Sequence, residues 1–410
     1  MSPTHAFSRP IVAFLIIGLV LIAIPFLGPS RSMLSLMAAM GINVVFALSY
    51  NMLMGQTGLL SFGHSVYFAL GSYAALHAMN AIETASYDGG LWAFVPVFTL
   101  PILGFAGGAL AGAVIGWPSC RSAGVAFSMI SLAIAELMSV AGFLFVAVFG
   151  GEDGLTGDRM NGIPLFGLSL GPLSEMYWFI AFWTFAAALA MFAWTRTPLG
   201  KMCQAVRDNP ERVSFVGYDP TRLRFLAFIA AGGFAGLAGG MSAVNYEIAT
   251  PETFSIIPSG MVLLMTYIGG ARHFAGPVLG AILLTYMQSN LSDYSEAWLL
   301  YLGLLFIVVV MFAPAGMSGV VLGLWTGLHG PTRRMFIGHW LRIAGSGAIL
   351  FGGLILFVEL AVRRNTIDQG FVPFGLYMRA DHAWPWLFAV VMMVLGGVML
   401  RGAARRSVAP

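Results

Sequence analysis

Four polar side chains that could contact a small solute lie in one apolar stretch of the chain, residues 51–71: Gln56, Thr57, Ser61 and His64. Glycines interrupt the same stretch, which favours a broken or re-entrant helix. Unwound backbone at membrane depth is tolerated only where it is buried in protein or faces water, so these side chains could line a solute path. The alternative is hydrogen bonding between closely packed helices, and for His64 we favour a packed, hydrogen-bonded role.

One carboxylate, Glu136, lies well inside the apolar run 122–149. An ion within a membrane span is costly, which makes Glu136 another candidate for the translocation path. Glu359 is a weaker candidate, because it lies near the end of its apolar run, where water is close. No basic partner for Glu136 is evident, so a structural or protonated Glu136 is favoured over a transport role.

Catalytic chemistry is not indicated. ATP hydrolysis needs a phosphate-binding loop of the type GxxxxGK[ST], and the single lysine, Lys201, is followed by Met202. Cys120 and Cys203 occur outside any spacing typical of metal ligands, which favours ordinary packing. No polar group of acid, base and nucleophile stands out. We therefore expect no enzyme activity, no metal and no cofactor in this chain.

The elements that carry these residues must be membrane helices. Hydrophobic residues make up 59% of the 410 residues, only 9% are charged, and the mean hydropathy is +0.86. Soluble domains carry roughly a quarter charged residues. The apolar runs predict an all-α, polytopic transmembrane helical bundle with broken or re-entrant helices and about 10–12 membrane segments. With 20 basic and 17 acidic residues, the chain has no nucleic-acid signature.

The charged residues between the apolar runs predict a topology, because cytoplasmic loops collect Lys and Arg. With the N-terminus inside, the inside gaps hold Arg121, six cations between Arg196 and Arg224, Arg272 and the C-terminal arginines, while the outside gaps hold mainly acids. Arg31 and the pair Arg363 and Arg364 depart from this pattern. We expect a multi-pass protein of a bacterial inner membrane with both termini in the cytoplasm.

The longest basic gap, residues 196–224, is too polar to enter a bilayer. A short surface helix over about residues 210–216 is predicted from its capping signals, which are Asn209, Pro210, Glu211 and Gly217. Asp219 and Pro220 repeat the start signal for the next membrane segment. A small capped helix beside Arg207 and Arg212 would transmit force from a soluble partner. The alternative is a solvated basic loop on anionic lipid.

Two glycine series recur at every fourth position, which places each series on one helix face: Gly104, Gly108, Gly112 and Gly116, then Gly232, Gly236 and Gly240. Small faces let helix backbones approach closely in lipid. We expect both series to serve packing alone.

Four segments together resemble the permeases of branched-chain amino acid ABC importers: GINVVFALSYNMLMGQTGLLSFGHSVYFALGSY, GGEDGLTGDRMNGIP, RTPLGKMCQAVRDNPERVSFVGY and YIGGARHFAGPVLGA. They occur in the family's order, and the resemblance spans roughly Met33 to Leu322. It implies that the cytoplasmic segment couples the chain to an ATPase, through Arg207, Asp208, Asn209, Glu211, Arg212 and Gly217.

The resemblance further implies a second homologous permease subunit, two cytoplasmic ATPase subunits that use the ATP, a periplasmic solute-binding protein and membrane lipid as partners. The outer segment from Gly150 to Gly162 is the candidate for receiving the binding protein. The solute would be a branched-chain or related amino acid. Alternatives are urea, short amides or small aromatic acids in the same family, or an ATP-independent secondary transporter.

The expected organisation has three parts. Residues 1–32 form an N-terminal membrane helix, residues 33–322 the permease core with its coupling loop, and residues 323–410 a C-terminal extension with about two further membrane helices. This extension departs from the family pattern, and its role is open.

Overall fold

The computed structural model describes residues 14, 18–19, 21–165, 167–295, 297–313, 315–328, 333–364, 370–371, 378–379 and 381–405. The chain divides into two compact units, Met1–Tyr286 and Met287–Pro410. Each unit is described by itself. The domain boundaries expected from the sequence stay predictions.

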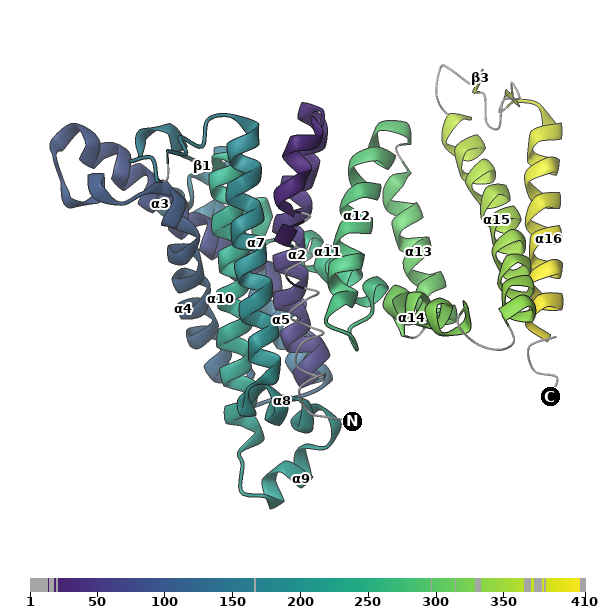
Figure 1. Ribbon diagram of the computed structural model, residues 1–410, viewed down its shortest axis with the longest axis horizontal. Coiled ribbons are helices and arrows are strands. Elements are labelled where there is room, and N and C mark those ends of the chain that lie inside the picture. The colour runs from purple at the N-terminus through teal and green to yellow at the C-terminus, as the bar shows by residue number, and fades with distance from the viewer. Residues whose placement is uncertain are drawn as a thin grey trace. The chain divides into compact units, whose positions relative to one another are not determined.

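The first unit is a bundle of long helices (Figure 1). Its helices are α2 (Arg31–Thr57), α3 (His64–Asp88), α4 (Leu100–Ser119), α5 (Val125–Leu144), α6 (Val146–Phe149), α7 (Leu173–Arg196), α8 (Pro198–Asp208), α9 (Pro210–Phe215), α10 (Pro220–Tyr246) and α11 (Ile256–Gly269). Helix α12 (Ala275–Tyr294) begins in this unit. Short 3-10 turns are η1 (Ile24–Leu27), η2 (Leu91–Phe94), η3 (Val97–Thr99), η4 (Gly151–Asp153), η5 (Arg159–Asn161) and η6 (Pro251–Phe254).

Among the described residues, six helical stretches are long and apolar enough to cross a membrane: 31–57, 97–119, 125–144, 173–196, 220–246 and 345–362. A bent pair of helices, 298–311 with 316–323, forms one more candidate span. The all-α polytopic class predicted from composition is confirmed. The N-terminal apolar run 11–27 lies partly outside the described residues.

Helices α4 and α10 pack on each other through the two glycine series. A Cβ atom added at Gly108 would come within 3.0 Å of the backbone of Gly232 and Gly236, and one added at Gly236 would meet Gly104 and Gly108 in the same way. The pairing of early α4 with late α10 makes the two helices antiparallel. Backbones this close leave no room for side chains, which confirms the packing role expected for both series.

Two short strands join the loops at the C-terminal end of α10. β1 (Leu155–Thr156) pairs antiparallel with β2 (Ile248–Ala249), so that Leu155 lies opposite Ala249. The loop 150–162 is thereby attached to the segment that follows α10.

The second unit contains α13 (Trp298–Phe312), α14 (Gly316–Leu328), α15 (Arg333–Arg363), α16 (Ala383–Arg405) and the antiparallel strands β3 (Gly370–Phe371) and β4 (Met378–Arg379). Helices α15 and α16 pack through Leu356, Leu360 and Ala389, with Trp386 against them. Glu359, the weaker of the two intramembrane acids, accepts a hydrogen bond from the Tyr301 hydroxyl at 3.0 Å. A neutral phenol donor therefore faces this carboxylate.

Candidate functional site

The break predicted from the glycines lies between α2 and α3. Helix α2 ends at Thr57, Gly58 closes it in the left-handed conformation at φ 72°, and α3 begins at His64. The two helices have 27 and 25 residues, so each is long enough to cross a bilayer, which takes about 20. Residues 58–63, called the break below, thus separate two long helices.

The break is hydrogen-bonded to α5. The Ser128 hydroxyl donates to the Leu60 carbonyl at 2.7 Å, and the Phe62 N–H donates to the Ser131 hydroxyl at 3.0 Å. The Tyr50 hydroxyl donates to the Ser61 carbonyl at 3.0 Å. Backbone groups that lack helical partners are thereby satisfied by side chains, as buried non-helical backbone requires.

His64 is fully buried among aromatic rings. Its Nε2 lies 2.9 Å from the Ser49 hydroxyl, its ring stacks on Phe46, and Tyr50 meets it edge to face. This environment matches the packed, hydrogen-bonded role favoured from the sequence. A contact between His64 and solute stays a prediction.

The other polar residues near the break face different surroundings. The Thr57 hydroxyl donates to the Leu53 carbonyl at 2.6 Å, within its own helix, and the Ser61 side chain is buried. Gln56 is also buried, and it lines a cavity together with Asn51. These residues follow one another along the end of α2 and the break, but they do not converge on one common pocket.

Glu136 lies apart from the break, on an exposed face of α5. Its neighbours Leu137 and Val140 are 67% and 65% exposed. A carboxylate on a span is expected to face protein or a water-filled space in place of lipid. Glu136 thus lies on the exposed surface of this unit that α5 forms.

The basic gap 196–224 contains two helices, of which the sequence analysis predicted only the second. Helix α8 begins at Pro198, and the Thr197 hydroxyl caps it by accepting from the Gly200 N–H at 3.1 Å. Thr before Pro at the first helical position is a start signal that could have revealed it. Val206 of α8, Val213 of α9 and Leu223 of α10 form a small apolar cluster. The gap is therefore a folded element.

The short helix predicted over about 210–216 is confirmed as α9. The Asn209 side chain accepts from the Arg212 N–H at 3.0 Å, and Gly217 follows the helix with φ 92°. Phe215 and Val216 are 88% and 74% exposed. The tip of α9 therefore presents an apolar surface beside Glu211 and Arg212.

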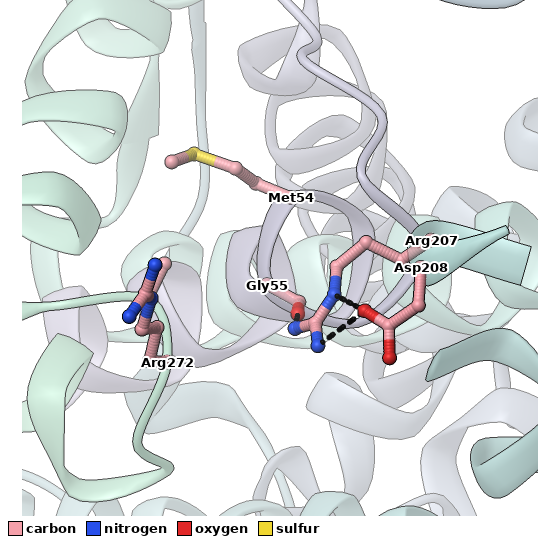
Figure 2. A pocket seen from close by; sticks show the side chains of 6 residues that line it. Met54, Gly55, Arg207, Asp208 and Arg272 are labelled. Atoms are coloured by element: carbon pink, nitrogen blue, oxygen red, sulfur yellow. Dashed lines mark hydrogen bonds and ion pairs between the residues drawn. The ribbon is translucent and has the colours of Figure 1, made fainter. Parts of the chain in front are cut away.

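Arg207 joins the basic gap to the end of α2. Its guanidinium donates to the Gly55 carbonyl and, at 2.9 Å, to the Asp208 carboxylate (Figure 2). Its aliphatic stem lies against Gly58, since a Cβ added there would be 3.0 Å from the Arg207 Cγ. The sequence analysis missed this contact, which brings together two motifs that it had treated separately.

Beside Arg207 lies a cavity of about 400 Å³, lined by residues of α2, α7, α8 and the segment that follows α11. Its cationic lining residues are Arg196, Lys201, Arg207 and Arg272. In the part of the chain that the structure describes, no group of three or more His, Cys, Asp or Glu side chains could hold a metal ion.

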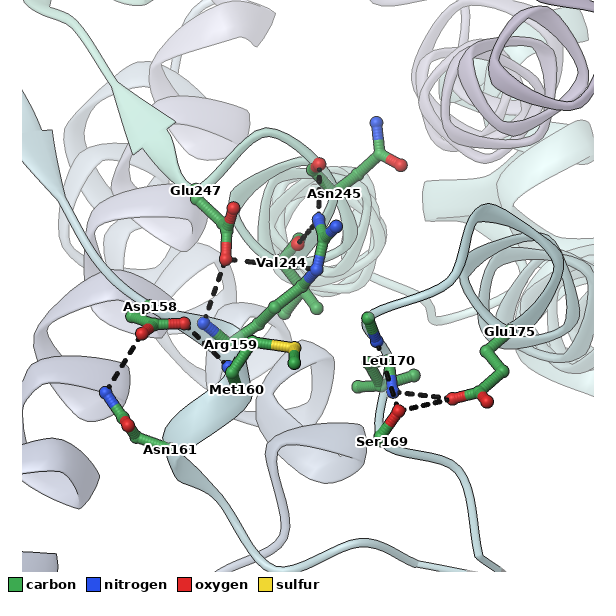
Figure 3. A network of polar contacts seen from close by, with 11 residues as sticks. Asp158, Arg159, Met160, Asn161, Ser169, Leu170, Glu175, Val244, Asn245 and Glu247 are labelled. Carbon is green, nitrogen blue, oxygen red and sulfur yellow. Dashed lines mark hydrogen bonds and ion pairs between the residues drawn. The ribbon is translucent and has the colours of Figure 1, made fainter. Parts of the chain in front are cut away.

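At the opposite end of α10, the loop 150–162 is fixed by a second arginine. The Arg159 guanidinium donates to the carbonyls of Val244 and Asn245 at 3.3 and 3.0 Å, and its backbone N–H donates to the Glu247 carboxylate at 3.0 Å (Figure 3). Cationic donors at a helix C-terminus are favourable, because free carbonyls there carry partial negative charge.

The described thiols are free and buried, as expected from the sequence. Burial raises the pKa of the Cys203 thiol on α8 to about 11 and that of Cys120 to about 12. Neutral thiols are poor nucleophiles and metal ligands, so both side chains serve packing.

A family described as the permease component of the branched-chain amino acid transport system matches residues 32–314. The high-affinity branched-chain amino acid permease protein LivM of Escherichia coli K12 is 26% identical over 326 residues, which is 74% of each chain. LivH of the same strain is 22% identical over 289 residues, 67% of this chain and 90% of LivH. BraD of Pseudomonas aeruginosa PAO1, a permease of the same description, is 23% identical over 299 residues, covering 67% and 91% of the two chains. No solved structure matches the chain.

Proposed function

Because the chain belongs to the branched-chain amino acid ABC permease family, we propose that it is one membrane subunit of an importer driven by separate ATPase subunits. The solute proposed is a branched-chain amino acid or a close relative, carried across a bacterial inner membrane. ATP is bound and hydrolysed by the partner subunits and not by this chain.

The observation that carries the proposal is the contact of Arg207 with the end of α2. A coupling element must reach the membrane helices by a direct contact, and the Arg207 hydrogen bond to the Gly55 carbonyl provides one. The break that follows Gly58 is hydrogen-bonded to α5. A movement of α8 would therefore be passed through the end of α2 and the break to α5, the helix that carries Glu136.

The proposed docking surface for the ATPase is α9. Its exposed Phe215 and Val216 are suited to a groove in a soluble partner, and Glu211 and Arg212 flank them with both charge signs. Asn209 caps the start of this helix and Gly217 follows its end, while Asp208 pairs with Arg207 on α8. Nucleotide binding to the ATPases would favour one conformation of the permease and hydrolysis the other, each by differential affinity.

Surface properties support a proposal for the remaining partners. The face of α5 with Glu136 is proposed to face a second, homologous permease subunit across the solute path, because lipid would not solvate a carboxylate. The outer loop 150–162, which β1 and Arg159 fix in place, is proposed to receive the periplasmic solute-binding protein.

The test is uptake together with ATP hydrolysis by the assembled importer. Binding protein loaded with leucine, isoleucine or valine should stimulate hydrolysis, whereas urea, short amides and small aromatic acids should not. In Arg207→Ala the stimulation should fall by about tenfold, because a lost charge-assisted hydrogen bond corresponds to about 1.5–3 kcal/mol. Arg222→Ala is the matched control, since this exposed cation of α10 forms only a local ion pair with Asp219.

Two outcomes would contradict the proposal. Stimulation by urea or an aromatic acid alone would move the chain to another branch of the family. Uptake that persists after deletion of the ATPase subunits would establish the ATP-independent secondary transporter.

A further inference from the structure

The cavity beside Arg207 is electrostatically one-sided. Arg196, Lys201, Arg207 and Arg272 line it, and no carboxylate does. Asp208 pairs with Arg207 from the adjoining space, which neutralises one of these charges at most. Such a site favours an anion. An amino-acid zwitterion fits poorly, because its ammonium group would lie among the same cations.

The cavity lies at the depth where two apolar spans end. Its lining includes Gln56 from the last turn of the span 31–57 and Arg196, the final residue of the span 173–196. Phe192, one turn earlier on α7, meets Phe274 edge to face with ring centroids 5.3 Å apart, and the Arg196 guanidinium lies 4.9 Å from the Phe192 ring centre. Aromatic rings and cations thus share one wall, as is common at a membrane interface.

Two buried amides of α2 also line the cavity. Asn51 and Gln56 are 4% and 6% exposed, and their carbonyl oxygens have no hydrogen-bond partner in the described part of the chain. An unpaired buried acceptor costs about 1–3 kcal/mol. Each amide has an oxygen that can accept a hydrogen bond from a ligand hydroxyl and a nitrogen that can donate one to a ligand oxyanion. A half-turn of the amide exchanges the two atoms, so either residue could bind either group.

We propose that this cavity binds the head group of an anionic phospholipid, with the phosphate among the four cations and head-group hydroxyls at the amides of Asn51 and Gln56. Basic pockets between membrane helices on the cytoplasmic side are typical head-group sites. A lipid bound here would touch Arg207, and so would lie against the contact between the basic gap and α2.

The experiment uses the full-length chain in a neutral detergent and follows thermal unfolding. Phosphatidylglycerol should raise the Tm by about 3 °C, because a ligand that binds only the folded chain stabilises it. Phosphatidylcholine, free glycerol phosphate and leucine should not. The double variant Arg196→Glu with Arg272→Glu should lose the shift. The matched control Arg121→Glu with Arg222→Glu, two exposed cations outside the cavity, should keep it.

The amount of phospholipid that copurifies per chain is the second measurement, and it should fall in the cavity variant but not in the control. Equal shifts by glycerol phosphate and phosphatidylglycerol would assign the site to a soluble phosphate and overturn the lipid proposal. A shift with leucine, or equal loss in both double variants, would overturn it too. The measurement needs neither ATP nor transport, so its outcome is separate from that of the proposed importer function.

Discussion

Arg159 and Arg207 perform the same chemical task at opposite ends of α10, and their surroundings differ. Each guanidinium donates to backbone carbonyls near the C-terminus of a membrane helix: Arg159 to the end of α10, Arg207 to the end of α2. The Arg159 side chain is 15% exposed and lies 3.8 Å from Glu247, within loops that β1 and β2 hold together. Arg207 is 37% exposed, borders cavities and pairs with an exposed aspartate.

The different exposure of the two arginines shows that the same contact, a guanidinium on helix-end carbonyls, can hold one region fixed and leave another adjustable. Burial and a strand pair leave Arg159 few alternative positions. Arg207 can exchange its partners for water or a ligand at modest cost, because exposed ion pairs contribute only about 0–1 kcal/mol. We therefore expect the end of the unit at Arg159 to be structurally fixed and the end at Arg207 to be adjustable.

The largest expected effect separates the two arginines by stability. Arg159→Ala should lower the free energy of unfolding by about 3 kcal/mol, since it removes the donor to two helix-end carbonyls and the ion-pair partner of the Glu247 carboxylate. Arg207→Ala should lower it by only about 1.5 kcal/mol, the lower end for a charged donor, because this side chain is partly exposed. Denaturant unfolding of both variants in the same detergent measures the difference. Equal losses would mean that the two ends do not differ in rigidity.

A pair of glycines sharpens the same comparison. Gly154 in the loop 150–162 has φ 75° and its added Cβ would strike the Ala249 backbone, whereas an added Cβ at Gly58, with φ 72°, would come close only to the Cγ of Arg207. Both alanines carry backbone strain of about 1–2 kcal/mol, but only Gly154→Ala must also displace backbone. The loss at Gly154 should exceed that at Gly58 by about 2 kcal/mol in thermal unfolding. A larger loss at Gly58 would reverse the comparison.

The smallest effect concerns Cys203, which tests whether α8 stays folded. Because burial raises its pKa to about 11, the thiol should react slowly with maleimide at pH 8 and quickly after unfolding. Because the thiol loses its proton at a higher pH in the folded chain than in the unfolded chain, its contribution to the free energy of unfolding is fully present below about pH 9. This contribution is lost as the pH rises to about 11. Rapid labelling of the native chain at pH 8 would show that α8 opens readily.

Local signals explain what the sequence could predict. Asn209 and Pro210 predict the start of α9 within one turn of chain, and the glycines around residue 58 favour a break there. The class of fold follows from apolar length alone. Helix α8 was missed, although Thr197 and Pro198 carry the same kind of signal as Asn209 and Pro210.

Contacts between distant residues could not be predicted in this way. Arg207 and Gly55 are 152 positions apart, and nothing in either neighbourhood identifies the other. The glycine series indicated close packing but not that α4 and α10 pack on each other. Whether Gln56, Thr57, Ser61, His64 or Glu136 contacts solute depends on surfaces that a second subunit would complete, so these roles stay predictions.

The close packing of α4 on α10 through their glycines has a practical consequence for measuring motion. Two antiparallel backbones in direct contact cannot slide past each other without steric overlap. The pair of helices therefore provides a fixed reference for distance measurements. Spin labels or fluorophores attached to the exposed flanks of these helices would keep a constant separation through a transport cycle. Displacements of α5, α8 or the loop 150–162 could then be measured as changes in their distance from α4 and α10.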